Sequence, residues 1–253
     1  MHLIKSKVTR SEKTLVLLDY DGTLAPIADT SEEALFPLRA KAALQRLLPI
    51  PRYRVSIISG RAVEDVAAMV GLEDMIYAGN HGLEILYPGG RWVHPEAARL
   101  KAKLAEVTKR LKDELGHIPG LLIEDKGVTV SIHYRLVVGD LQEEIMPRVR
   151  KVLHPFVTYF RLTEGKKVLE VRPKISVHKG TVIYSIAHLL NAKEQDVIIY
   201  IGDDETDEDA FAALKPGDIS IRVGESASSR ANYYLCDTDE VHDLLEVLGL
   251  WSS

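Results

Sequence analysis

The residues of this sequence best suited to chemistry are carboxylates, gathered in two short clusters. In the first, Asp19 and Asp21 stand two positions apart, directly before Gly22 and Thr23. Aspartate carboxylates attack phosphorus and transfer protons, so a pair at this spacing predicts a nucleophile and a proton shuttle for phosphoryl transfer. An ordinary Asp-Gly turn at the end of a strand is the alternative interpretation of the same residues.

The second cluster holds six acids within the seven positions 203–209. A helix N-terminus explains one or two acids, because carboxylates interact favourably with the helix dipole, but it does not explain six. Crowded carboxylates repel one another unless a cation neutralises them, and a set of oxygen ligands favours magnesium. The cluster therefore predicts a metal site, and no Cys or His cluster competes for a softer metal.

Two weaker signals complete a set suited to phosphoryl transfer. Ser59, Gly60 and Arg61 stand between an expected strand and an expected helix, where a hydroxyl and backbone N–H groups can bind an anion. Lys179 stands just before another expected helix. Each signal alone has an ordinary interpretation, as a turn or as a solvated lysine. In this order along the chain, and together with the acids, they predict a phosphoryl-transfer site.

Short apolar runs that end abruptly are expected to position these residues. Continuous apolar runs bounded by polar residues are typical of strands buried on both faces of a parallel sheet. Helical patterns between such runs predict a doubly wound α/β domain, in which ligands bind at the carboxyl ends of the strands. The expected strands cover residues 15–18, 55–58, 75–78 and 197–201, and the expected helices cover 38–48, 63–70 and 181–190.

The middle of the chain has a different pattern. Residues 128–134 alternate with a period of two, which is typical of a half-buried strand in an antiparallel sheet. We therefore expect a smaller α+β cap domain, residues 84–175, inserted into a core domain formed by residues 1–83 and 176–253. Within the cap the sequence predicts a hairpin over 84–93, helices over 95–115 and 141–153, and strands over 157–162 and 167–172.

Composition excludes several classes of protein. The chain has 253 residues, 46% of them hydrophobic, which excludes a disordered or fibrous protein. Its net charge of −5 and the absence of a basic stretch interleaved with aromatic residues argue against a nucleic-acid partner. No apolar run approaches the ~18 residues of a membrane span, and charged residues at the start argue against a signal peptide. With Cys236 as the only cysteine, we expect a cytoplasmic protein without a membrane partner.

These motifs resemble the four motifs of the haloacid dehalogenase superfamily of phosphatases. Three longer stretches, 18–27, 79–84 and 202–211, resemble the trehalose-6-phosphate phosphatase family, and the resemblance covers nearly the whole chain. It implies that Asp19 is the nucleophile, that Asp21 is the general acid and then the base, and that Mg²⁺ is the cofactor. The implied metal ligands are Asp19, Asp203 and the carbonyl of Asp21, with Asp204 and Asp207 as further ligands or as partners of metal-bound water. Thr23, Ser59 and Lys179 are then expected to hold the phosphoryl oxygens.

The resemblance also implies a sugar-binding role for residues of the cap. Glu124, Lys126 and Glu170 match the family's cap residues, and charged groups suit a substrate that presents hydroxyls. Solvated side chains at strand ends are the alternative interpretation. Further candidates for substrate binding are Gly60, Arg61, Asn80, His81, His133 and Arg135; a tight turn is the alternative for Asn80 and His81, and a buried structural role for His133.

The preferred hypothesis is a magnesium-dependent phosphatase that hydrolyses trehalose 6-phosphate through an aspartyl-phosphate intermediate. A phosphatase for another sugar phosphate, such as sucrose phosphate or a glycosyl-phosphoglycerate, is the alternative within enzymes. A non-catalytic regulatory module that binds sugar phosphates is the alternative from another class, although the pair Asp19 and Asp21 argues against it. The resemblance further implies a functional pairing with a trehalose-6-phosphate synthase.

Overall fold

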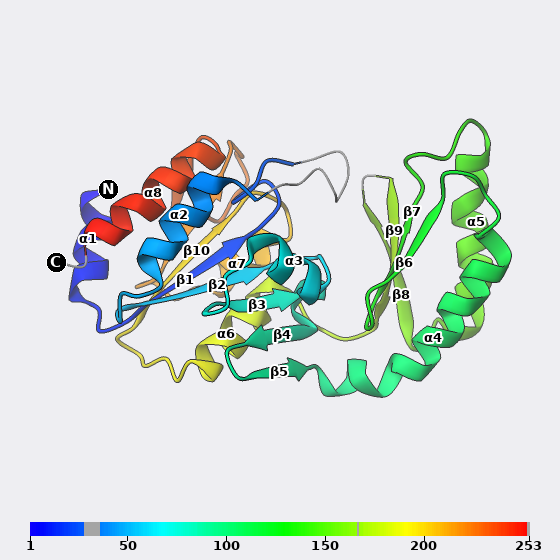
Figure 1. Ribbon diagram of the computed structural model, residues 1–253, viewed down its shortest axis with the longest axis horizontal. Helices are drawn as coiled ribbons and strands as arrows, with labels where there is room; N and C mark the ends of the chain where they lie inside the picture. Colours follow the sequence, from blue (N-terminus) through cyan, green and yellow to red (C-terminus); the bar gives the residue numbers. More distant parts are fainter. Residues whose placement is uncertain (28–35, 166, 252–253) are drawn as a thin grey trace. The chain divides into compact units, whose positions relative to one another are not determined.

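A computed structural model describes residues 1–27, 36–165 and 167–251 of the chain. The chain divides into two compact units, each coloured by sequence in Figure 1. The core unit comprises Met1–Trp92 and Val177–Ser253, and the cap unit comprises Val93–Ser176.

The core unit is built on an eight-stranded sheet of order β12-β11-β10-β1-β2-β3-β4-β5. The six strands from β12 to β3 are parallel to their neighbours, and β4 pairs antiparallel with β3. The strands are β1 (Thr14–Asp19), β2 (Tyr53–Ile58), β3 (Ile76–Gly79), β4 (Glu84–Tyr87), β5 (Gly90–Val93), β10 (Val197–Gly202), β11 (Ile219–Val223) and β12 (Tyr233–Leu235).

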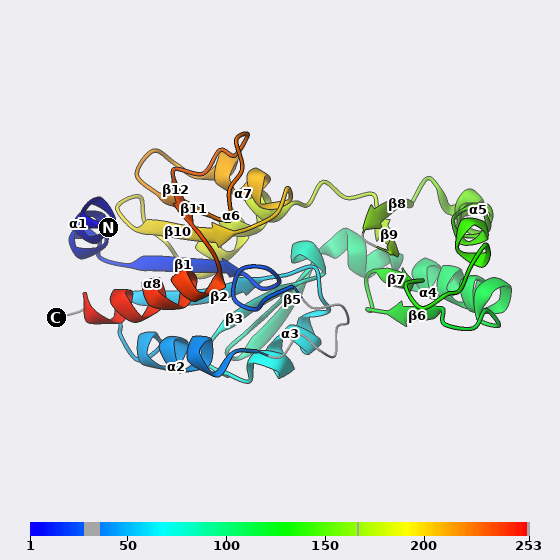
Figure 2. The same ribbon diagram turned by 90° about the horizontal axis from the view of Figure 1, so that it is seen from above.

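Helices cover both faces of this sheet, as Figure 2 shows. Alternate residues of β1 enter different cores: Val16 and Leu18 pack with α1, α2, α3 and α8, whereas Leu15 and Leu17 pack with α6 and α7. Burial on both faces explains why β1 is continuously apolar. The helices are α1 (His2–Arg10), α2 (Leu38–Leu47), α3 (Val63–Val70), α6 (Lys179–Leu189), α7 (Asp207–Ala213) and α8 (Thr238–Leu250).

The hairpin expected in the cap belongs instead to the core sheet, so the boundary predicted at residue 84 was wrong. The short 3₁₀ helix η1 (Asn80–Gly82) turns the chain back after β3, and Glu84 then lies opposite Gly79 in the antiparallel pair. A hairpin pattern is local and does not specify the sheet that its strands join. Here the short connection, a three-residue 3₁₀ helix followed by Leu83, leaves β4 next to β3.

The cap unit is a four-stranded antiparallel sheet of order β6-β7-β9-β8 with two long helices. Ile132 and Leu169, which are register partners, point into an apolar core shared with α4 and α5. Successive side chains of a strand alternate between faces, so Ser131 and Glu170 lie on the other face. The elements are α4 (Pro95–Leu115), β6 (Leu122–Asp125), β7 (Val130–His133), α5 (Leu141–Leu153), η2 (His154–Phe156), β8 (Phe160–Gly165) and β9 (Val168–Pro173).

The carboxyl ends of the central strands bring distant parts of the sequence together. Leu18 of β1 lies beside Ile201 of β10, so Asp19 and Gly202 end neighbouring strands side by side. Asp19 is also the register partner of Ile58, the last residue of β2. The predicted doubly wound α/β core is confirmed. Strands β1, β2 and β10 end at the positions where the sequence has its polar clusters. Within the described chain, no helix is long and apolar enough to cross a membrane.

Candidate active site

The loop after β1 is a tight turn stabilised by its own backbone. The carbonyl of Tyr20 accepts hydrogen bonds from the N–H groups of Leu24 and Ala25, at 2.9 and 3.0 Å. Gly22 donates to the carbonyl of Ala25 at 2.7 Å and adopts a positive φ of 83°, a conformation that favours glycine. The turn begins directly after Asp19, the buried last residue of β1.

Gly22 is also needed because Asp203 packs against it. A Cβ atom at position 22 would lie 2.1 Å from Asp203 Oδ2, so any side chain there would displace the Asp203 carboxylate. The hydroxyl of Thr23 donates to Asp203 Oδ1 at 3.2 Å. The loop after β1 and the loop after β10 are therefore in direct contact, as the parallel neighbouring strands predicted.

Lys179 connects the end of β1 to the start of α7 by hydrogen bonds to a carboxylate in each. Its side chain is 4% exposed, and its Nζ donates to Asp19 Oδ1 at 2.9 Å and to Asp207 Oδ1 at 2.7 Å. Burial alone would lower the pKa of Lys179, but Asp19 and Asp207 outweigh burial and raise the pKa above its ordinary value. The lysine is therefore a fixed cation beside the Asp19 carboxylate.

Asp207 is fully engaged by donors. Its Oδ1 accepts from Lys179 and, at 2.6 Å, from the hydroxyl of Tyr200, and its Oδ2 accepts from the N–H groups of Asp203 and Asp204 at 3.0 Å each. Tyr200 was not among the residues predicted from the sequence, because it lies within an apolar run. Its residue type could have indicated a polar partner, because the hydroxyl of a tyrosine buried in a strand usually has a hydrogen-bond partner.

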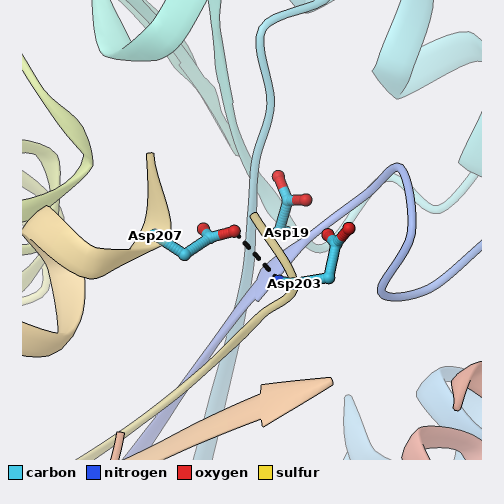
Figure 3. Close-up of side chains that lie close together, drawn as sticks. All are labelled: Asp19, Asp203 and Asp207. Carbon is cyan, nitrogen blue, oxygen red and sulfur yellow. Dashed lines mark hydrogen bonds between the residues drawn. The ribbon is translucent and has the colours of Figure 1, made fainter. Parts of the chain in front are cut away.

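Three carboxylates converge at the carboxyl ends of β1 and β10 (Figure 3). Each of Asp19, Asp203 and Asp207 offers an oxygen, and these oxygens lie within 4.8 Å of one another. Burial and the neighbouring carboxylates Asp207 and Asp204 raise the pKa of Asp203 to about 6. Burial also raises the pKa of Asp19, against the effect of Lys179. A bound cation would relieve this repulsion, so the cluster is compatible with a metal site.

Asp204 differs from its neighbours because its carboxylate closes its own loop. Its Oδ1 accepts from the N–H and the hydroxyl of Thr206, both at 2.7 Å, and lies 3.8 Å from Lys179 Nζ. Burial opposes ionisation of Asp204, but Lys179 and Thr206 outweigh it and lower its pKa. Asp204 is therefore an ionised residue that shapes the loop between β10 and α7.

The loop after β2 contributes Ser59 and Arg61. Ser59 is buried, and its Oγ accepts from the N–H of Arg61 at 3.1 Å. The Arg61 guanidinium donates to both carboxylate oxygens of Asp21, at 2.9 and 2.6 Å, and lies 5.5 Å from the centroid of the Tyr20 ring. The structure thus places Arg61 on the predicted proton shuttle.

Asn80 and His81 are engaged in the fold next to this loop. The amide of the buried Asn80 donates to Glu84 Oε2 at 2.8 Å, and Glu84 is also paired with Arg91. The imidazole of His81 packs on Gly60, where a Cβ atom would lie 2.7 Å from His81 Cε1. Glycine at position 60 therefore lets the loops after β2 and β3 approach closely.

The candidate residues of the cap gather on the face of its sheet opposite the helices. Lys126 Nζ lies 3.7 Å from Glu170 and 4.0 Å from Glu124, and His133 Nε2 lies 2.8 Å from Glu124. The hydrogen bond from His133 lowers the pKa of Glu124. Arg135 lies partly buried in the loop that follows β7. The sequence did not single out Thr129 and Arg172, which contact Glu170 at 3.3 and 3.8 Å.

Comparison with known proteins decides the family. A model of the trehalose-phosphatase family matches residues 17–239, which include every residue of the candidate active site described above. The chain belongs to the trehalose-phosphatase family. It is 34% identical to the probable trehalose-phosphate phosphatase 2 of Oryza sativa subsp. japonica, over 96% of this chain and 70% of that protein.

Other members and structures differ in length and identity. The trehalose-phosphate phosphatase of Mycobacterium marinum is 40% identical over 82% of this chain, which spans 53% of that relative. A solved structure of a trehalose-6-phosphate phosphatase related protein is 27% identical, with a TM-score of 0.80, and the match covers 93% of this chain and 97% of that one. A haloacid dehalogenase-like hydrolase from Bacteroides thetaiotaomicron, 16% identical with a TM-score of 0.65 over 93% and 99% of the chains, shares the fold.

Proposed function

We propose that this member of the trehalose-phosphatase family hydrolyses trehalose 6-phosphate to trehalose and phosphate. The observation that carries the proposal is the buried Lys179, which donates hydrogen bonds to both Asp19 and Asp207. Asp203 belongs to the same carboxylate cluster, and Asp21 follows Asp19 by two positions. A protein that only bound sugar phosphates would have no need of a carboxylate held in this way, so the regulatory module is disfavoured.

In the proposed reaction Asp19 attacks phosphorus, and the bond from phosphorus to the sugar oxygen breaks. Asp21 donates a proton to that oxygen, because a sugar alkoxide is a poor leaving group. Water then attacks phosphorus in the aspartyl-phosphate and gives a proton to Asp21. This attack breaks the bond from phosphorus to Asp19, so phosphate leaves and the Asp19 carboxylate is regenerated. Thr23, Ser59 and Lys179 are proposed to hold the phosphoryl oxygens, with the charge of Lys179 offsetting repulsion between Asp19 and the phosphate.

Mg²⁺ is the proposed cofactor. Asp19 and Asp203 would hold it through carboxylate oxygens and Asp21 through its backbone carbonyl, a set of hard ligands that magnesium prefers. When bound, the ion would neutralise charge on the transferring phosphoryl group. Asp207 already accepts from four donors, and Asp204 shapes its own loop, so both are proposed to orient the site rather than to bind the ion directly.

The cap unit is proposed to recognise the sugar through Glu124, Lys126 and Glu170. Their mutual contacts hold three charged groups on one polar face of the cap sheet, where they are suited to bind sugar hydroxyls. Arg135, Asn80 and His81 remain further candidates for substrate contacts. A synthase that makes trehalose 6-phosphate would supply the substrate, which is the basis of the proposed functional pairing.

The test is phosphate release by the purified chain from a panel of sugar phosphates. We expect the largest kcat/KM on trehalose 6-phosphate, with loss of activity in EDTA and its return on addition of Mg²⁺. Asp19→Asn should abolish turnover on every substrate. A larger kcat/KM on sucrose phosphate or a glycosyl-phosphoglycerate would transfer the assignment to that substrate, and full activity of Asp19→Asn would overturn the mechanism.

A further inference from the structure

A buried histidine of the last helix contacts the loop that carries the proposed proton shuttle. His242 belongs to α8 and is 2% exposed, and its Nε2 lies 2.9 Å from the carbonyl oxygen of Leu24. The two residues are 218 positions apart in the sequence. Its hydrogen bond goes to Leu24, a residue without a proposed catalytic or binding role, so the reaction does not by itself explain this histidine.

The geometry determines which ring nitrogen carries the proton. A carbonyl oxygen only accepts, so Nε2 of His242 must be the donor. Its Nδ1 is buried and has no hydrogen-bond partner among the described residues. The carboxylate of Asp239, one turn earlier in α8, lies 3.8 Å from that nitrogen, beyond hydrogen-bond distance. Among the described residues, the ring therefore makes one directed hydrogen bond, from Nε2 to Leu24.

The accepting carbonyl lies in a turn whose backbone N–H groups bond within the turn itself. Leu24 is fully buried, so its carbonyl has no access to water. The N–H groups of Leu24 and Ala25 both bond to the carbonyl of Tyr20, inside the same turn. The contact from His242 instead ties the turn to a helix of the surrounding fold. Losing the donor would leave a buried acceptor unsatisfied, which costs more than the bond itself contributes.

We propose that His242 is a positioning residue for the Tyr20–Ala25 turn. Through Leu24 it fixes the backbone that presents Asp21 and Thr23, and so it sets the orientation of the acid and of a phosphoryl ligand. The kinetic part of this proposal rests on the proposed phosphatase function. The structural part concerns only the order of the turn, and it can be tested without catalysis.

Two substitutions of equal polarity separate a directed bond from simple packing. Glutamine can place its amide donor near the position of Nε2, whereas the amide of asparagine is too short to reach Leu24. We expect His242→Gln to retain slow hydrogen exchange at the Leu24 and Ala25 amides, measured in EDTA on the full chain. His242→Asn should exchange these amides roughly 5- to 100-fold faster, the order expected when a buried carbonyl is left without a donor.

A matched control comes from the same helix. The hydroxyl of the buried Tyr53 donates to the carbonyl of Leu248 of α8 at 2.7 Å. Tyr53→Phe removes a buried bond to α8 without touching the turn. It should lower Tm, as His242→Asn does, yet leave exchange of the Leu24 and Ala25 amides unchanged at temperatures well below Tm.

The kinetic readout is a split between kcat and KM. His242→Asn should lower kcat about 3- to 10-fold on trehalose 6-phosphate with little change in KM, and His242→Gln should restore most of it. Equal exchange in the Gln, Asn and wild-type chains would overturn the positioning role, whatever the activity. Faster exchange in the Asn chain alone would sustain it even if trehalose 6-phosphate proved not to be the substrate.

Discussion

Arg61 binds both carboxylate oxygens of Asp21 with two donors of its guanidinium, at 2.9 and 2.6 Å. Bidentate pairs of this kind are geometrically specific and stronger than neutral hydrogen bonds. They connect the loop after β2 to the loop after β1, so the orientation of the proposed acid depends on a residue from the neighbouring strand. The sequence predicted Arg61 as a substrate-binding residue, and the two roles have different kinetic consequences.

Arg61→Met should lower kcat/KM on trehalose 6-phosphate by about 10- to 100-fold, since a hydrogen bond to a charged group contributes ~1.5–3 kcal/mol. The loss should be much smaller on p-nitrophenyl phosphate, whose leaving group needs no proton from Asp21. Asp21→Asn should show the same bias. The measurement is the ratio of the two kcat/KM values for each variant.

Arg39→Met is the matched control, because Arg39 pairs with Asp243 and Glu246 on the protein surface. It should leave both rates unchanged. Equal proportional losses on the two substrates for Arg61→Met would contradict a role through Asp21 and favour direct binding of the phosphate.

That Asp19 and Asp203 would lie at one edge of the sheet was predictable, because the ends of strands follow from local patterns. An apolar run that stops at a carboxylate indicates where a buried strand leaves the sheet, and parallel neighbours bring such ends together. The helices expected before and after these runs are confirmed with small shifts at their ends, for example at Lys179, which is the first residue of α6.

The pairings between side chains were not predictable in the same way. That Tyr200 bonds to Asp207, or Arg61 to Asp21, depends on the directions of side chains from different elements, which the sequence pattern does not contain. The hairpin over 84–93 failed for a related reason. Its turn residues specify a hairpin, but only contact with β3 determines that it extends the core sheet.

Mg²⁺ should stabilise the wild-type chain against heat and should not stabilise Asp203→Asn. At a hundredfold excess over Kd, a ligand that binds only the folded state contributes about 2.7 kcal/mol. At ~2–4 °C per kcal/mol for a chain of this size, Tm should rise by roughly 5–11 °C. The measurement is thermal unfolding with Mg²⁺ and with EDTA.

Asp113→Asn serves as the control for that experiment, because Asp113 is an exposed acid of α4 that pairs with Lys109. It should show the wild-type shift. A full shift in Asp203→Asn would mean that the ion binds elsewhere on the chain.

In the metal-free chain, the contribution of Asp203 to stability should fall as the pH rises through about 6. Asp203 has a folded pKa near 6, above its ordinary value of 3.8, because burial and the neighbouring carboxylates oppose its ionisation. A group with a raised folded pKa contributes stability that is complete below the unfolded pKa and is lost as the pH rises through the folded pKa. In EDTA, Asp203→Asn should therefore gain on wild type between pH 4 and pH 7.

Denaturant midpoints of the two chains across that range provide the measurement, because the difference between them removes the titration of all other groups. The difference should grow with pH and level off above pH ~7. Saturating Mg²⁺ should reverse it near neutral pH, since the ion favours the ionised carboxylate. Parallel curves in EDTA would show that Asp203 is not destabilised by its neighbours.

Substitutions on the polar face of the cap sheet should separate substrate recognition from catalysis. Lys126→Met and Glu170→Gln each remove one charge from a contacting pair at 3.7 Å. If these groups bind sugar hydroxyls, each change should lower kcat/KM on trehalose 6-phosphate by about 10- to 100-fold, because a hydrogen bond to a charged group is lost. Hydrolysis of p-nitrophenyl phosphate should stay nearly unchanged, since that substrate has no sugar to bind.

Glu164→Gln is the control for these substitutions, because it removes a charge from the opposite face of the same sheet. Glu164 lies on β8 of the same sheet and is the register partner of Leu169, so it points away from Glu170. It should affect neither substrate. Parallel losses on both substrates in Lys126→Met would instead mean that the pair stabilises the cap, because a loss of cap stability would not depend on the substrate. No loss on either substrate would mean that Lys126 and Glu170 form an ion pair without a role in substrate binding.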